Sequence, residues 1–244
     1  MAKQKGILKV EGKLGDLSFY KLNGKYVVRR KGGGFTREAI KHGANMARTR
    51  DNGKEFGHCS AVNKAFRVTL RPLYEGHTFK YFHSRLMKLF TSLKDLDTDS
   101  SRGSRKVYVG AVTEEGQELL KTYSYTPRCE PLTVLPFTMR YDADMHMLLI
   151  KNVNGDLIQF AKGADCVGLT LAGLHFDFVT TLGSLHLSEP VYLNADTAQQ
   201  DVSLCIENVA EEFEMVFLGI RFYEVVDGKR SLLKRDNAVG FGVV

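Results

Sequence analysis

The chain has 244 residues, of which 43% are hydrophobic and 25% are charged, fractions that exclude a disordered or collagen-like chain. The net charge of +6 is unevenly spread: residues 1–110 carry 24 basic and 9 acidic side chains, whereas residues 111–244 carry 10 basic and 19 acidic ones. These counts give net charges of +15 and −9 for the two parts. The sequence holds no membrane-length apolar run and no signal peptide, so we expect a cytoplasmic protein with no membrane partner.

The first segment, residues 1–34, predicts a small β-meander that ends in a glycine hinge. Short β-type runs at 7–10, 17–22 and 25–30 are separated by glycine turns. Asn23-Gly24 indicates a tight hairpin, because a type I′ turn needs positive φ at both central residues. Residues 32–34 are three glycines that lack the rest of a phosphate-binding loop, so we interpret them as a hinge.

The second segment, residues 35–121, is basic and predicts helices. Apolar residues recur every three or four positions from Phe56 onward and again from Phe82. Pro72 to Gly76 marks a corner between these stretches, which predicts an antiparallel helical hairpin. We expect an exposed loop at 97–105 and a further short helix at 114–121.

The third segment, residues 122–244, is acidic and predicts β-structure throughout. The strand candidates are short and evenly spaced: 132–141, 145–151, 157–160, 167–171, 174–179, 185–187, 202–207, 215–226, 231–234 and 239–243. Asn154-Gly155 and Asp227-Gly228 predict two further hairpins. The fold class is therefore predicted to be α+β, with a meander and helical hairpin followed by an all-β sandwich of immunoglobulin-like or jelly-roll type.

Several local stretches resemble a known family. They are MAKQKGI at 1–7, GKLGDLSFY at 12–20, RKGG at 30–33, RTRDNGKEFG at 48–57 and SSRG at 100–103. Together they resemble a family of uncharacterised proteins of Bacteroidetes bacteria over the first 105 residues. That resemblance implies a basic α/β N-terminal half and a divergent β-rich C-terminal half. It implies no activity and no catalytic residue, and it leaves open whether the lineage is cellular or phage-derived.

No motif in the sequence points to an enzyme. Cys59 lies in GHCSA, which is similar to a nucleophile elbow, but it falls on an apolar helical stripe and is expected to pack in the core. The four cysteines form no C-x-x-C pair, which favours free thiols in a reducing compartment. His175 and His186 could meet across strands and bind a metal with Asp177, but a structural role is favoured. We therefore expect no catalytic residues, no metal and no cofactor.

The charge split favours a structural protein that binds copies of itself. A protomer with a basic and an acidic end can associate head to tail into a filament, tube, ring or shell. The basic side is predicted to use Phe19, Tyr20, Arg29, Arg30, Arg67 and Arg71. The acidic side is predicted to use Glu211, Glu212 and Glu214.

Clustered basic residues also match the pattern of phosphate binding, so nucleic acid is the alternative partner. The candidate phosphate contacts in that case are Lys64, Arg67, Arg71, Lys80 and Lys88.

Overall fold

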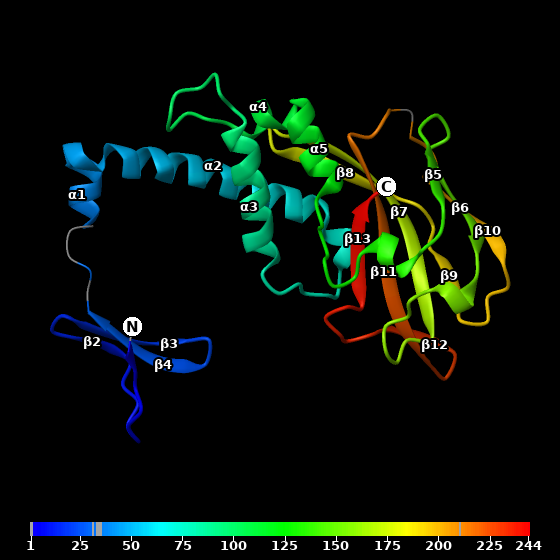
Figure 1. Ribbon diagram of the computed structural model, residues 1–244, viewed down its shortest axis with the longest axis horizontal. Coiled ribbons are helices and arrows are strands. Elements are labelled where there is room, and N and C mark those ends of the chain that lie inside the picture. Colours follow the sequence, from blue (N-terminus) through cyan, green and yellow to red (C-terminus); the bar gives the residue numbers. More distant parts are fainter. Residues whose placement is uncertain (1, 31, 33–35, 210) are drawn as a thin grey trace. The chain divides into compact units, whose positions relative to one another are not determined.

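A computed structural model describes residues 2–30, 32, 36–209 and 211–244 (Figure 1). The chain divides into two compact units between Asn52 and Gly53. The first unit contains a four-stranded antiparallel sheet of order β1-β4-β3-β2, followed by α1 and the 3-10 turn η1. Its elements are β1 (Ala2–Lys3), β2 (Gly12–Leu14), β3 (Leu17–Leu22), β4 (Lys25–Arg30), α1 (Arg37–His42) and η1 (Ala44–Met46).

The predicted meander is confirmed at the Asn23-Gly24 turn, which joins β3 to β4. Asn23 and Gly24 have φ values of 48° and 78°, and β3 pairs with β4 from Leu17 opposite Arg30 to Leu22 opposite Lys25. The predicted strand at 7–10 is wrong, because these residues form a loop that connects β1 to β2. Gly32 is described and exposed, whereas the rest of the predicted hinge, Gly33 and Gly34, lies outside the described residues.

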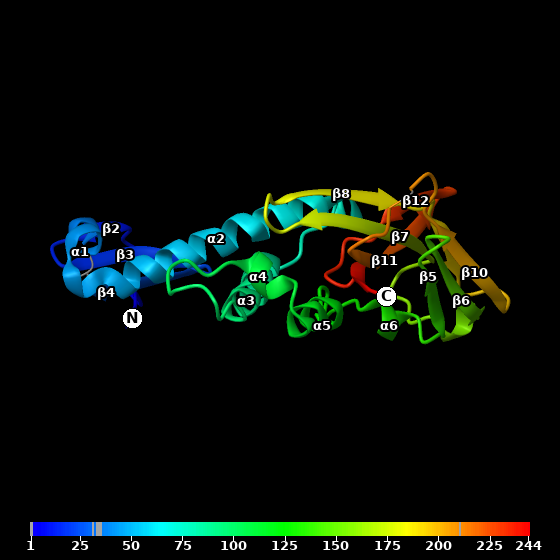
Figure 2. The ribbon, with the colours of Figure 1, turned by 90° about the horizontal axis from the view of Figure 1, so that it is seen from above.

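The second unit begins within α2 (Ala47–Thr69) and continues through helices that precede the strands. These are η2 (Arg71–Tyr74), α3 (Phe82–Asp95), α4 (Val107–Ala111), α5 (Glu114–Thr122) and α6 (Pro131–Val134). The two predicted helices do pack together: Cys59 Sγ donates to the Phe90 carbonyl at 3.6 Å, and Asn63 Nδ2 donates to the His83 carbonyl at 3.0 Å. The expected antiparallel arrangement is wrong, because α3 runs across α2 rather than alongside it (Figures 1 and 2). Residues 70–81 separate the two helices, a longer connection than a helical hairpin uses. The predicted helix at 114–121 is confirmed as α5.

Two antiparallel sheets complete the second unit. A three-stranded sheet has the order β10-β6-β5, and a six-stranded sheet has the order β12-β11-β7-β8, with β13 added to β11 and β9 added to β7. The larger sheet curls into a half-barrel (Figure 1). The strands are β5 (Met139–Asp142), β6 (Met147–Val153), β7 (Cys166–Asp177), β8 (Leu182–Leu187), β9 (Val191–Asn194), β10 (Gln200–Cys205), β11 (Met215–Val226), β12 (Lys229–Leu232) and β13 (Val239–Val243).

Some strand predictions are wrong in detail. The expected strand at 132–141 is divided between helix α6 and strand β5. The expected strand at 157–160 is absent, and the 3-10 turn η3 (Gly155–Leu157) occupies the predicted Asn154-Gly155 hairpin. The two strands expected at 167–171 and 174–179 are one long strand, β7. The Asp227-Gly228 hairpin is confirmed, with φ values of 50° and 73° between β11 and β12.

One hydrophobic core runs through the second unit, from the helices to both sheets. Phe66 of α2 lies 5.3 Å from Phe90 of α3 and 5.2 Å from Phe176 of β7, measured between ring centroids. Figure 2 shows the C-terminal part of α2 running alongside β8, where Gly183 approaches Thr69. No helix in the described part of the chain is both long and apolar enough to cross a bilayer.

Candidate self-association surfaces

The N-terminal sheet has two chemically different faces, which the strand register defines. One face carries an apolar stripe made by Leu14, Leu17, Phe19, Tyr26 and Val28. Leu14 is 70% exposed and Leu17 is 40% exposed. Among the described residues of this unit, Val27 is the one buried hydrophobic side chain. Phe19, Tyr26 and Val28 are half-buried, so the stripe is most accessible at its Leu14–Leu17 end.

The opposite face is basic and aromatic. The same register places Lys13, Lys25 and Arg29 on this face with Tyr20. The Arg29 guanidinium lies 5.7 Å from the centroid of the Tyr20 ring, a cation–π contact. Of the four N-terminal residues predicted for self-association, Tyr20 and Arg29 thus share this face, whereas Phe19 and Arg30 lie on the apolar one.

A closed loop projects from the same unit between β1 and β2. Gln4 closes it: its side-chain oxygen accepts from the Val10 N–H at 2.9 Å, and its Nε2 donates to the Val10 carbonyl at 3.0 Å. Lys9 Nζ donates to the carbonyls of Gln4 and Gly6, both at 2.7 Å. Ile7 and Leu8 lie between these anchors and are almost fully exposed. We call residues 5–9 the apolar tip.

The other predicted basic residues belong to the second unit. Arg67 Nε donates to Asn63 Oδ1 at 2.8 Å, and Arg71 lies 5.6 Å from the centroid of the Tyr74 ring. Lys64 and Lys88 are exposed on α2 and α3, and Lys80 lies 5.3 Å from the centroid of the Tyr81 ring. These residues are distributed over α2, α3 and the corner between them.

The predicted acidic residues occupy the segment before β11. Glu211, Glu212 and Glu214 are all exposed. Glu214 Oε2 lies 3.2 Å from His175 Nδ1 and accepts from the Phe176 N–H at 3.3 Å, so this carboxylate is fixed against the end of β7. Glu214 also lines a groove, which the sequence did not reveal.

The groove measures about 480 Å³, within the usual range of ligand-binding clefts, roughly 300 to 1,000 Å³. Its walls are α4 and α5 on one side and the end of β7 on the other. Val112 and Val179 contribute exposed apolar surface to it, at 74% and 65% exposure. Asp177 and Glu214 add carboxylates, and Lys121 is the one cation among its lining residues. The Thr180 hydroxyl donates to Asp177 and lowers the pKa of that carboxyl, which is therefore ionised.

A buried ionic network holds the α4 wall of this groove. Glu55, which is 4% exposed, accepts from Arg105 Nε at 2.9 Å and Nη2 at 2.8 Å and from Lys94 Nζ at 3.0 Å. Asp97 Oδ2 accepts from the Lys106 N–H at 2.8 Å. His58 Nε2 accepts from the Val107 N–H at 3.1 Å, at the first residue of α4. The loop before α4 is thus fixed by side chains from α2 and α3.

Strand β8 begins three residues after Val179 of the groove and lies at the edge of its sheet. No described strand pairs with the outer side of β8. The edge of β13, by contrast, is covered: Thr126 Oγ1 accepts from the Phe241 N–H and donates to the Phe241 carbonyl, both at 2.9 Å. β12 carries Lys229 and Arg230, charges of the kind that discourage edge pairing. β8 has no Lys, Arg, Asp or Glu and no such protection.

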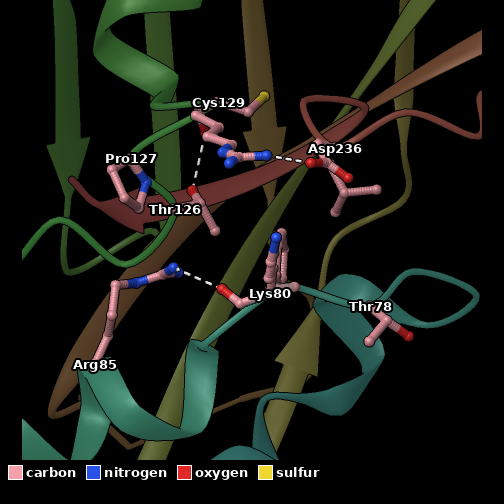
Figure 3. Close-up of a pocket in the computed structure, with 10 residues that line it drawn as sticks. Thr78, Lys80, Arg85, Thr126, Pro127, Cys129 and Asp236 are labelled. Carbon is pink, nitrogen blue, oxygen red and sulfur yellow. Dashed lines mark hydrogen bonds and ion pairs between the residues drawn. The ribbon is translucent and has the colours of Figure 1, made fainter. Parts of the chain in front are cut away.

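A second cavity, between the α3 start and residues 126–129, is too small for an organic ligand. Figure 3 shows Arg85 donating to the Lys80 carbonyl. Arg128 forms an ion pair with Asp236. The cavity volume of about 30 Å³ is the space of about one water molecule. The buried Nε of Arg85 has no protein partner, and a water in this cavity would satisfy it. We therefore assign this cavity a structural role, in which the Arg85 hydrogen bond and the Arg128–Asp236 ion pair hold its walls together.

The histidines considered as metal ligands do come together, around an aromatic ring. His175 and His186 have ring centroids 5.7 Å apart, and Phe213 lies 4.8 Å from His175 and 5.8 Å from His186. Within the described ranges, no three His, Cys, Asp or Glu side chains are placed to hold a metal ion. Cys59 lies on the core face of α2, and burial raises the pKa of its thiol, which disfavours the thiolate form.

Comparison with family models, curated proteins and solved structures gives no match for this chain. The resemblance to the Bacteroidetes family therefore stays a prediction.

Proposed function

We propose that this is a structural, non-enzymatic protein that assembles head to tail with copies of itself. The observation that carries the proposal is the N-terminal sheet, whose apolar stripe is exposed at Leu14 and Leu17 and is no more than half-buried at Phe19, Tyr26 and Val28. A sheet is stable when one face is buried against a second layer, and a small single-layer sheet is marginal in water. A surface on a second copy would supply that layer.

Charge supports a contact between unlike surfaces. Residues 1–52 carry 13 basic and 4 acidic side chains, a net of +9, whereas residues 53–244 carry 21 basic and 24 acidic ones. The basic first unit of one copy would be attracted to the acidic part of the second unit of another copy and repelled by another first unit. Such a heterologous contact extends into a filament or tube, or closes into a ring or shell, according to the rotation between neighbours.

The acceptor would be the β-rich part of the second unit, which we treat as a β-sandwich. Leu148 and Leu204 of the three-stranded sheet belong to the same core as Leu171 and Phe217 of the six-stranded sheet, as in two packed layers.

The test is the mass of the purified full-length protein as its concentration and the salt concentration change. We expect species larger than a monomer that grow with protein concentration and weaken as salt rises, together with regular particles in negative-stain images. A monodisperse monomer at every concentration and at low salt would refute the proposal.

A second candidate, nucleic-acid binding, is supported by the basic face of the N-terminal sheet. On this face the Arg29 guanidinium lies 5.7 Å from the centroid of the Tyr20 ring, so phosphates could pair with the cation and bases could stack on the ring. Binding to mixed-sequence DNA or RNA should then fall steeply with added salt. Absence of binding at low salt would eliminate this candidate.

A further inference from the structure

We infer that the apolar tip of one copy inserts into the groove between α4–α5 and β7 of another copy. This inference rests on the proposed self-assembly and identifies the two surfaces that meet. The tip offers Ile7 and Leu8 on a closed loop. The groove offers Val112 and Val179 between two walls of the second unit.

The tip has the properties of a preorganised ligand. Its ends are joined by the two hydrogen bonds between the Gln4 side chain and Val10, and the Gln4 N–H donates to the Tyr26 carbonyl at 3.0 Å, which anchors the loop to β4. Because the loop is already closed, little chain entropy is lost when it binds. Lys5 and Lys9 flank the two apolar side chains and make the tip cationic.

The groove complements the tip in both polarity and charge. Most of its lining residues are apolar or aromatic, and Asp177 and Glu214 place carboxylates beside them. Both carboxylates are held by hydrogen bonds, Asp177 to the Val179 N–H at 2.7 Å and Glu214 to the Phe176 N–H at 3.3 Å. Fixed anions beside an apolar cleft favour an apolar segment with basic neighbours, which is what residues 5–9 present.

The experiment uses two full-length double variants that change exposed side chains. Ile7→Asp with Leu8→Asp removes the apolar tip, and Val112→Lys with Val179→Lys blocks the groove. Leu22→Asp and Leu157→Lys are the matched controls, since both residues are exposed and neither belongs to the tip or lines the groove. Thermal unfolding by circular dichroism checks that each variant folds.

We expect each double variant to associate at least about a hundredfold more weakly than the wild type. An equimolar mixture of the two should form a dimer and stop there, because it contains one intact tip and one intact groove. The control variants should assemble as the wild type does.

Three results would overturn the inference. A groove variant that still assembles shows that the N-terminal unit binds elsewhere, and the proposed function survives. Failure of the mixture to form a dimer shows that the tip and the groove do not meet each other. Loss of assembly in the control variants shows that the effect is not specific to these surfaces. A wild-type protein that is always monomeric refutes the proposed function itself.

Discussion

Replacing the buried carboxylate of Glu55 is the strongest single test of how the α4 wall of the groove is held in place. Glu55 Oε1 accepts from the Gly103 N–H at 2.7 Å and from Arg105 Nε, and its Oε2 accepts from Lys94 Nζ and Arg105 Nη2. Glu55→Gln keeps the shape of the side chain but removes its charge and replaces one acceptor with a donor. Lys94, itself 6% exposed, would then be left with Asp95 as its remaining carboxylate partner.

The size of the effect follows from the pKa of Glu55. The hydrogen bond from Arg105 is the largest cause that lowers this pKa, from 4.5 to about 2. At 1.36 kcal/mol per pKa unit, the ionised form is favoured in the folded state by about 3 kcal/mol. This agrees with the roughly 3 to 5 kcal/mol lost when one partner of a buried ion pair is removed. We expect Glu55→Gln to lower the free energy of unfolding at pH 7 by about 3 kcal/mol.

The pH dependence has a definite sign. Because the folded-state pKa of Glu55 lies below the unfolded value, its stabilisation is complete above pH 4.5 and is lost as the pH falls toward 2. At pH 3 the difference between wild type and variant should have shrunk to about half.

The assay is urea unfolding followed by circular dichroism at pH 7 and pH 3. Glu118→Gln on α5 is the matched control, because Glu118 is exposed. A Glu55→Gln protein as stable as the control variant at pH 7 would refute the role given to this network. So would a difference that grows, rather than shrinks, as the pH falls.

Three further predictions concern packing and titration. Gly240→Ala should prevent stable folding, because the added Cβ would lie 1.8 Å from the Cys129 carbonyl oxygen. Gly57→Ala should raise the free energy of unfolding by about 0.5–1 kcal/mol, because Gly57 lies within α2 and its added Cβ would contact nothing. Thermal unfolding measures both. One thiol, the exposed Cys205, should react with a thiol reagent in the native protein and four after denaturation. Burial lowers the pKa of His58, so stability should fall as the pH drops below 6.5, and His58→Gln should remove part of that slope in pH-dependent urea melts.

Turn prediction succeeded or failed according to what surrounds each turn. The same reasoning applied to Asn23-Gly24 and Asn154-Gly155, yet the second pair starts a 3-10 turn. There the Asn154 side chain accepts from the Asp156 N–H at 3.0 Å, and the Gly155 N–H donates to the Thr197 carbonyl at 3.0 Å. A contact with a residue 42 positions away thus favours the 3-10 turn over a hairpin, and the local sequence cannot predict such a contact.

Helix periodicity identified α2 but placed its buried face wrongly at the N-terminal end. The periodicity places Phe56 on the buried face of this helix, whereas Phe56 is 61% exposed and its neighbour Glu55 is buried. Hydrophobic patterns assume that buried residues are apolar. Here the buried residue is charged, and its partners Lys94 and Arg105 lie 39 and 50 residues further along the chain. The sequence did not reveal the groove either, because α4, α5 and β7 come together only in the folded unit.

The division into units changes which residues can act as the basic partner. Of the 24 basic side chains before Gly110, 11 belong to residues 53–110 and therefore to the same unit as the acidic strands. Arg67 and Arg71, predicted for the basic side, are among them, and neither lines the groove. On the acceptor unit these arginines would repel a cationic tip. In the proposed assembly, the charge of the second unit would steer the tip away from the α2–α3 corner and toward the carboxylates beside α4 and α5, where a single lysine, Lys121, opposes it.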